Sequence, residues 1–260
     1  MQDRDLALLI KAARAAGDVA CRYAPDATKT WEKPGGAGPV TEADLAVNDT
    51  LHDILQTARP SYGWLSEESE DTPDRLNAQT LFIIDPIDGT RSFIEGSNTW
   101  AHSLAVVRDG EVTAAVIYLP MRDLLYAAAT GQGATLNDAP ITPRQTQNLN
   151  AAEVLSVKHN FKPEFWRATP PDLTRAHRPS LAYRMALVAE GRFDAMITFR
   201  PSWEWDVAAG DLILREAGAA TSDRAGQPLR FNNPIPQTSG ILAANPSLHA
   251  QIATQLTFES

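Results

Sequence analysis

Apolar residues recur at helical spacing in the first part of the chain. Between positions 5 and 23 they stand three or four residues apart, which predicts an amphipathic helix. The Gly- and Pro-rich stretch from Trp31 to Pro39 predicts a loop. Thr41 precedes a second helical pattern. Thr41 and Asp44 have the spacing of a capping box, although Glu or Gln is usual at the second position.

A different pattern begins after residue 62. Residues 81–84 (LFII) form a short continuous apolar run, which is typical of a strand covered on both faces. Further strand-like segments follow at residues 103–107, 112–119 and 124–129. Asp109-Gly110 separates the first two of these and predicts a hairpin turn. The first 140 or so residues therefore predict two helices packed on an antiparallel sheet.

The second half alternates between strand and helix. The expected strands are residues 153–157, 195–199 and 240–244, and the expected helices are residues 180–190, 204–216 and from 246 onward. Gly218 follows the second of these helices as a stop signal. We expect an N-terminal α+β domain, residues 1–145, and a C-terminal α/β domain, residues 146–260, which share one continuous core.

The composition of the chain excludes several classes of function but says little about the fold. The 260 residues carry a net charge of −9, which argues against a dedicated binder of nucleic-acid polymers, because such binders rely on Lys and Arg. Cys21 is the only cysteine, so an intrachain disulfide and a cysteine-ligated zinc site are excluded. No apolar run approaches the roughly 20 residues that cross a bilayer, and no signal-peptide pattern is present. We therefore expect a cytoplasmic protein with no membrane partner.

The most informative stretch is residues 85–90 (DPIDGT), which follows the buried apolar run. Pro and Gly predict a sharp turn that aims Asp85 and Asp88 at one point, where the carbonyl of Ile87 joins them. These are the hard oxygen ligands that Mg²⁺ or Mn²⁺ prefers. A helix that begins at Gly89 would offer free N–H groups to a phosphate at the same point. Taken alone, however, the motif is equally typical of an ordinary turn.

Other acidic residues are unremarkable one by one. Glu67 and Glu68 stand among further acids, as in a solvated loop. Asp206 lies where a helix starts, as an N-cap does, and Asp44 resembles a first-turn helix acid. What is informative is the order in which these acids and residues 85–90 follow one another along the chain.

Four segments in this order resemble the inositol monophosphatase superfamily of Mg²⁺-dependent, lithium-sensitive phosphatases. They are residues 40–44 (VTEAD), 67–69 (EES), 85–90 (DPIDGT) and 205–210 (WDVAAG). The resemblance covers nearly the whole chain. It implies a mixed α+β and α/β fold, a layered αβαβα sandwich of the inositol monophosphatase and fructose bisphosphatase type.

The resemblance also implies a set of metal ligands. Glu67, Asp85 and the Ile87 carbonyl would hold one metal ion, and Asp85, Asp88 and Asp206 would hold a second. Two or three Mg²⁺ ions are implied, with Mn²⁺ as a substitute and Li⁺ and Ca²⁺ as inhibitors. All the carboxylates are present, so a degenerate member used only for binding or regulation is disfavoured.

Catalytic and phosphate-binding roles follow from the same resemblance. Asp44 and Glu67 would lie near a third, weaker metal ion, and Thr90 would bond to Asp44 and help deprotonate the attacking water. Backbone amides of Gly89 and Thr90 would bind the phosphate. Lys33 falls where the family often has a lysine near the site. A homodimer is a further implication.

The substrate is less constrained than the chemistry. Residues 31–33 (WEK) and 156–159 (SVKH) resemble the bacterial branch of 3'(2'),5'-bisphosphate nucleotidases, in which Lys158 or His159 would meet a second phosphate or the adenine. A surface loop is an equally good interpretation of residues 156–159. Arg200 also suggests an anionic feature in the substrate, while the spacing of Glu204 from Asp206 looks too short for a ring-binding acid. We expect hydrolysis of adenosine 3',5'-bisphosphate to AMP and phosphate by metal-activated water. Inositol 1-phosphate, histidinol phosphate and fructose phosphates are the alternatives.

Overall fold

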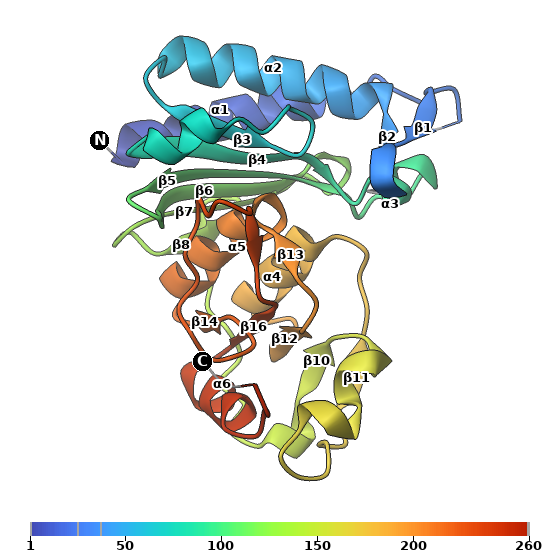
Figure 1. Ribbon diagram of the computed structural model, residues 1–260, viewed down its shortest axis with the longest axis vertical. Coiled ribbons are helices and arrows are strands. Elements are labelled where there is room, and N and C mark those ends of the chain that lie inside the picture. The colour runs from blue at the N-terminus through green and yellow to red at the C-terminus, as the bar shows by residue number, and fades with distance from the viewer. Residues whose placement is uncertain (1, 25, 37, 259–260) are drawn as a thin grey trace.

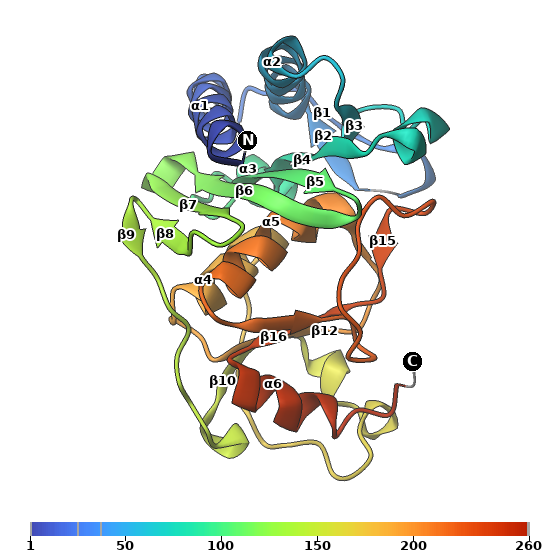
Figure 2. The same ribbon diagram turned by 90° about the vertical axis from the view of Figure 1, so that its left-hand side faces the viewer.

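Five layers of secondary structure stack along the long axis of the molecule (Figure 1). The computed structural model describes residues 2–24, 26–36 and 38–258. Helices α1 (Gln2–Ala20) and α2 (Glu42–Ala58) form the first layer, on one face of a seven-stranded sheet. Helices α4 (Leu181–Ala189) and α5 (Glu204–Glu216) cover its other face. A five-stranded sheet and helix α6 (Pro246–Ala253) complete the αβαβα sandwich, which confirms the expected fold (Figure 2).

The large sheet runs in the order β3-β4-β5-β6-β7-β8-β9. Its strands are β3 (Gly63–Ser66), β4 (Thr80–Asp88), β5 (Ala101–Arg108), β6 (Glu111–Leu119), β7 (Leu124–Ala129), β8 (Ala134–Leu136) and β9 (Ala139–Pro140). All neighbours are antiparallel except β3 and β4, which are parallel because a crossover joins them. Asp109 and Gly110 both have positive φ and make the predicted hairpin turn.

The N-terminal helices differ from the sequence pattern in detail. Helix α1 ends at Ala20, three residues before the predicted end. The segment predicted as a loop, Trp31 to Pro39, overlaps a short hairpin of β1 (Thr30–Glu32) and β2 (Pro39–Thr41), so its two ends are extended strands. The capping box at Thr41 is confirmed. Its hydroxyl accepts from the amide of Asp44, and Asp44 Oδ2 accepts from the amide of Thr41 at 2.9 Å.

The smaller sheet runs in the order β11-β10-β12-β16-β14 and mixes parallel and antiparallel pairs. Its strands are β10 (Glu153–Leu155), β11 (Thr174–Ala176), β12 (Ala195–Thr198), β14 (Ala220–Ser222) and β16 (Ile241–Ala244). The sequence pattern missed β11 and β14, because these short strands are defined by hydrogen bonds to strands elsewhere in the chain. Gly218 follows α5 at φ +94°, the left-handed position that favours glycine after a helix.

The central core lies between the two sheets, around α4 and α5. It combines residues of both halves, for example Ile83 and Ile117 with Met196 and Leu212. The expected domain division at residues 145 and 146 stays a prediction. Among the described residues, no helix is both long enough and apolar enough to span a membrane.

Candidate active site

A β-bulge in β4 brings two of the predicted acids to one face of the sheet. Asp85 pairs with Ser103 of β5 and Asp88 pairs with Ala101, so three steps along β4 match two steps along β5. In a regular strand, residues three apart point to opposite faces. Because of the extra residue, Asp85 and Asp88 share a face, as their partners do. The sharp turn that the sequence predicted is therefore a bulge within a strand that continues to Asp88.

Three carboxylates from three separate elements converge beside this bulge. Glu67 follows β3, Asp85 lies in β4 and Asp206 lies in the first turn of α5. One carboxylate oxygen of each lies within 4.8 Å of the others. Asp85 Oδ1 is buried and accepts no hydrogen bond. An orphaned buried oxygen among hard oxygen ligands fits a divalent cation, so the residues present suit the implied metal.

The electrostatics of this cluster favour a cation. Burial and the charge of Glu67 raise the pKa of Asp85 well above its ordinary value. Burial and the charge of Asp88 do the same to the pKa of Asp206. Like charges this close are costly in a buried site without a counter-ion, and a bound cation removes that cost.

Asp88 has a second set of partners at the start of α4. Its Oδ2 accepts from the hydroxyl of Ser180 and from the amide of Ala182, both at 2.6 Å. These bonds leave Oδ1 as the oxygen that can serve a metal. The role of Asp88 as a ligand of a second metal ion stays a prediction. The charge of Asp88 nevertheless raises the pKa of both Asp85 and Asp206.

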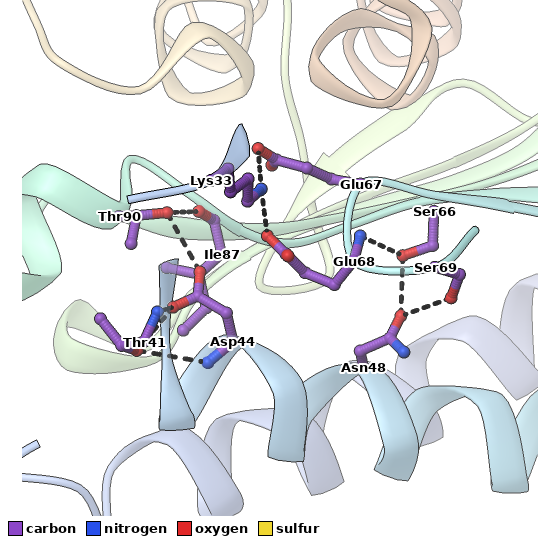
Figure 3. A network of polar contacts seen from close by, with 10 residues as sticks. All are labelled: Lys33, Thr41, Asp44, Asn48, Ser66, Glu67, Glu68, Ser69, Ile87 and Thr90. Atoms are coloured by element: carbon purple, nitrogen blue, oxygen red, sulfur yellow. Dashed lines mark hydrogen bonds and ion pairs between the residues drawn. The ribbon is translucent and has the colours of Figure 1, made fainter. Parts of the chain in front are cut away.

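Asp44 and Thr90 form the bonded pair that the resemblance implied (Figure 3). Thr90 Oγ1 donates to Asp44 Oδ1 at 3.0 Å and lies 3.2 Å from the carbonyl oxygen of Ile87. Asp44 Oδ2 is occupied by the capping box of α2. Burial raises the pKa of Asp44, against the hydrogen bonds from Thr41 that lower it. The pair therefore sits at the edge of the site with its geometry fixed on both sides.

Lys33 lies between two glutamates of the β3–β4 connection, as Figure 3 shows. Its Nζ is 2.7 Å from Glu67 Oε1 and 2.6 Å from Glu68 Oε1. Burial lowers the pKa of Lys33, but the two carboxylates outweigh burial and raise it. Burial raises the pKa of Glu68 to about 7, against the hydrogen bond from Lys33. Lys33 thus reaches the site as a counter-charge to a candidate metal ligand.

The segment that carries Glu67 and Glu68 is anchored, not a solvated loop. Asn48 of α2 accepts hydrogen bonds from the hydroxyls of Ser66 at 2.8 Å and Ser69 at 3.4 Å. The segment is therefore held against α2 and is not the solvated loop that these acids indicate when taken alone. Glu68, to which the sequence gave no role, is a neighbour of the site.

The cluster opens into a cavity of about 720 Å³. Its lining includes the cluster, Asp88, Gly89 and Thr90, and on another side the two cations Arg184 and Arg200 together with His177. Gly89 is the N-cap of α3 (Thr90–Ile94) at φ +100°, a left-handed conformation that favours glycine. The predicted helix start at this point is confirmed. The assignment of its amides to a phosphate stays a prediction.

Comparisons with known proteins agree with this geometry. The model of the inositol monophosphatase family matches residues 1–260. The chain belongs to the inositol monophosphatase family. The Nus factor SuhB of Escherichia coli K12 is 33% identical over 254 residues, which cover 93% of this chain and 91% of SuhB. The inositol-1-monophosphatase of Bacillus subtilis is 32% identical over 222 residues, 82% of this chain and 81% of that protein.

Solved structures show the same architecture. The extragenic suppressor protein SuhB of Bartonella henselae superposes with a TM-score of 0.83 at 29% identity, over 96% of this chain and 97% of that one. SaIMPase-II with inositol monophosphate bound superposes with a TM-score of 0.80 at 25% identity, over 95% and 91% of the two chains. The protein is a phosphatase of the phosphoric monoester hydrolase class, and it acts on small phosphorylated substrates.

Arg200 and Lys158, two of the predicted substrate contacts, line different cavities. Arg200 lines the main cavity, and it also lines a second cavity of about 450 Å³ that shares His177 and Arg184 with the first. Lys158 lines a third hollow with Lys162 and Arg175. The structure does not bring Lys158 to either cavity beside the carboxylates.

Arg184 is a cavity residue that the sequence did not assign. It is only 9% exposed, and its Nη2 lies 2.9 Å from His177 Nε2 and 3.2 Å from the carbonyl of Pro179. The sequence alone does not single out Arg184, because the cavity that it lines is formed by segments far apart along the chain. Burial lowers the pKa of Arg184, and the charge of Arg200 lowers it further, against the charge of Asp88.

Glu204 is not a substrate contact in this structure. Its carboxylate accepts from the amides of Asn232 at 2.7 Å and Asn233 at 2.9 Å, and from Asn233 Nδ2 at 2.7 Å. It holds the loop after residue 230 against the start of α5. Because these three hydrogen bonds occupy the carboxylate, Glu204 is poorly placed to bind a substrate ring. This is a stronger reason than its short spacing from Asp206.

Proposed function

We propose that this phosphatase is Mg²⁺-dependent and hydrolyses a phosphomonoester that carries a second anionic group. Adenosine 3',5'-bisphosphate, converted to AMP and phosphate, is the substrate we favour. The observation that supports this choice is the position of Arg184 and Arg200. Both line the wall that the two cavities share, and within the described residues neither has a carboxylate at ion-pair distance.

Arg184 and Arg200 lie close enough to repel one another. Burial and the Arg200 charge disfavour the charged form of Arg184, while the charges of Asp88 and Asp206 favour it. An anionic group between the two guanidinium groups would relieve this repulsion and accept charge-assisted hydrogen bonds. The scissile phosphate would occupy the carboxylate side of the main cavity, so the second anion would lie toward the smaller cavity.

The carboxylate side of the cavity supplies the reaction chemistry. A phosphomonoester dianion repels hydroxide, and divalent ions, when bound, lower the pKa of water and stabilise the leaving alkoxide. Glu67, Asp85, the Ile87 carbonyl, Asp88 and Asp206 would hold these ions.

The Thr90–Asp44 pair would orient the attacking water and take its proton. The amides of Gly89 and Thr90 would bind the phosphate oxygens. The proposal also includes two or three bound metal ions, inhibition by Li⁺ and Ca²⁺, a homodimeric assembly and a cytoplasmic location.

Inositol 1-phosphate is the second candidate, and the names of the relatives favour it. Curated relatives are named inositol-1-monophosphatase, and SaIMPase-II has been solved with inositol monophosphate bound. SaIMPase-II has also been solved with 2'AMP bound, at a TM-score of 0.80 and 25% identity. That relative therefore accepts a nucleotide as well as an inositol phosphate.

The deciding experiment compares phosphate release from adenosine 3',5'-bisphosphate and inositol 1-phosphate with Mg²⁺. Arg184→Met and Arg200→Met should lower kcat/KM for the bisphosphate about 10- to 100-fold and affect inositol 1-phosphate much less, because charge-assisted bonds are worth about 1.5–3 kcal/mol. Arg175→Met, in the third hollow, is the matched control and should change neither. Equal losses on both substrates, or a wild-type preference for inositol 1-phosphate, would select the second candidate.

A further inference from the structure

Strand β5 carries two adjacent buried polar residues, His102 and Ser103, whose side chains have no assigned role. His102 is 0% exposed and Ser103 is 1% exposed. Successive residues of a strand point to opposite faces of a sheet. The two side chains therefore reach into different layers, and each makes a hydrogen bond to a segment that carries a candidate metal ligand.

His102 lies opposite the bulge in β4. The register places Pro86 and Ile87 together across from His102, between the pairs Asp85–Ser103 and Asp88–Ala101. Proline has no N–H, and a bulge interrupts the regular ladder of backbone bonds. The Pro86 carbonyl is instead bonded to Nδ1 of His102, which must donate because a carbonyl only accepts.

The His102 ring is held in place by its neighbours. Its centroid lies 5.5 Å from that of Trp100 and 6.3 Å from that of Tyr118. Nε2 is buried and finds no hydrogen-bond partner within the part of the chain that the structure describes, where the ring's polar contact is the bond to the bulge. A buried ring with this single bond favours a positioning role.

Ser103 makes the matching contact on the other face. Its Oγ donates to the carbonyl oxygen of Trp205 at 2.8 Å, directly before Asp206. Ser103 is also the register partner of Asp85. One short piece of β5 thus bonds to the two chain segments that present Asp85 and Asp206 to the cluster.

We propose that His102 and Ser103 are positioning residues that fix Asp85 and Asp206 in the geometry that binds metal. The proposal rests on the metal role of the cluster. Buried carboxylates repel one another before a cation binds, so the segments that carry them would move apart unless the fold holds them. The bond from His102 supports the bulge that turns Asp85 toward Asp206, and the bond from Ser103 ties the start of α5 to the same strand.

The test measures Mn²⁺ binding to the full chain by isothermal titration calorimetry, with urea unfolding in EDTA as a separate readout. His102→Leu removes the donor, whereas His102→Asn keeps an N–H at the place of Nδ1. We expect His102→Leu and Ser103→Ala to weaken Mn²⁺ binding about 10- to 100-fold, the range seen when groups that orient metal ligands are removed. His102→Asn should stay within about threefold of wild type by the same reasoning.

His249→Leu is the matched control. His249 lies in the outer helix α6 and bonds to Ser222, so its removal takes away a histidine hydrogen bond in a different layer from the carboxylate cluster. It should lower stability without changing Mn²⁺ affinity. Wild-type affinity in both His102→Leu and Ser103→Ala would overturn the proposal, and so would equal weakening in His102→Asn and His102→Leu. If the leucine variant does not fold, His102→Gln, which lacks a donor at the Nδ1 position, replaces it. A wild-type protein that binds Mn²⁺ but releases no phosphate would refute the proposed function and leave this test intact.

Discussion

Thr90 donates a hydrogen bond to Asp44 at 3.0 Å, although the two residues are 46 positions apart. Thr90 is the first residue of α3, and Asp44 lies in the first turn of α2. The second oxygen of Asp44 is held by the backbone and hydroxyl of Thr41. Because the capping box and Thr90 bond to different oxygens, the Asp44 carboxylate has a fixed orientation beside Thr90, which lines the cavity.

Removal of the Thr90 hydroxyl should slow catalysis without harming the fold. We expect Thr90→Ala to lower kcat about 10²- to 10³-fold, within the range for a lost proton-transfer group, while Thr90→Ser retains most activity. Steady-state phosphate release with saturating Mg²⁺ checks this. A kcat in Thr90→Ala close to that of wild type would mean that the pair only braces α2 against α3.

Neutralising Asp85 should raise the stability of the metal-free protein and abolish its activity. Asp85→Asn removes the buried member of a cluster of three like charges, so the free energy of unfolding in EDTA should rise by roughly 1–3 kcal/mol. The same change should abolish turnover at any Mg²⁺ concentration. Asp211→Asn is the control, because Asp211 is buried but bonded to Arg215 and Thr221. It should lower stability and leave metal affinity unchanged. A less stable Asp85→Asn protein in EDTA would contradict the repulsion argument.

The metal-free protein should lose stability as pH rises toward neutrality. The pKa of Glu68 is about 7 in the native state, raised from 4.5, and burial is the main cause. Between these values the native state holds a proton that the unfolded state has released, so the free energy of unfolding falls with pH. The raised pKa values of Asp44, Asp85 and Asp206 act in the same direction.

Urea unfolding in EDTA from about pH 5 to about pH 8 measures this slope. Glu68→Gln should flatten it, and saturating Mg²⁺ should reduce it, since a cation offsets the charges of its neighbours. A stability that rises with pH over this window in EDTA would show that these carboxylates are not destabilised by burial.

Glu204 should prove structural. Glu204→Ala leaves the amides of Asn232 and Asn233 without their acceptor, which should cost about 2–4 kcal/mol of stability. Glu204→Gln retains an acceptor oxygen and should lose less. Thermal or urea unfolding checks both variants. If Glu204→Ala is as stable as wild type but has a raised KM, the carboxylate contacts substrate after all.

The sequence by itself determined the elements with strong periodicity and the chemistry of the site. The helical spacing of α2, α4 and α5, the apolar run of β4 and the stop at Gly218 are local properties. The acids at Asp44, Glu67, Asp85, Asp88 and Asp206 were identified only because their motifs, in this order, resemble those of the family, and their roles toward a metal stay predictions. Local spacing was sufficient for the helices, the strand and the stop signal, since each depends on a few neighbouring residues.

Only the tertiary structure decided how those residues meet. No local pattern shows that a bulge puts Asp85 and Asp88 on one face, because the extra residue is defined only against β5. The partners of Lys33, Glu204 and Arg184 likewise come from distant segments, and Lys158 proved to lie elsewhere. Short strands such as β11 and β14 exist because neighbouring strands supply their hydrogen bonds. Long-range pairing and burial set these features, and both depend on the whole fold.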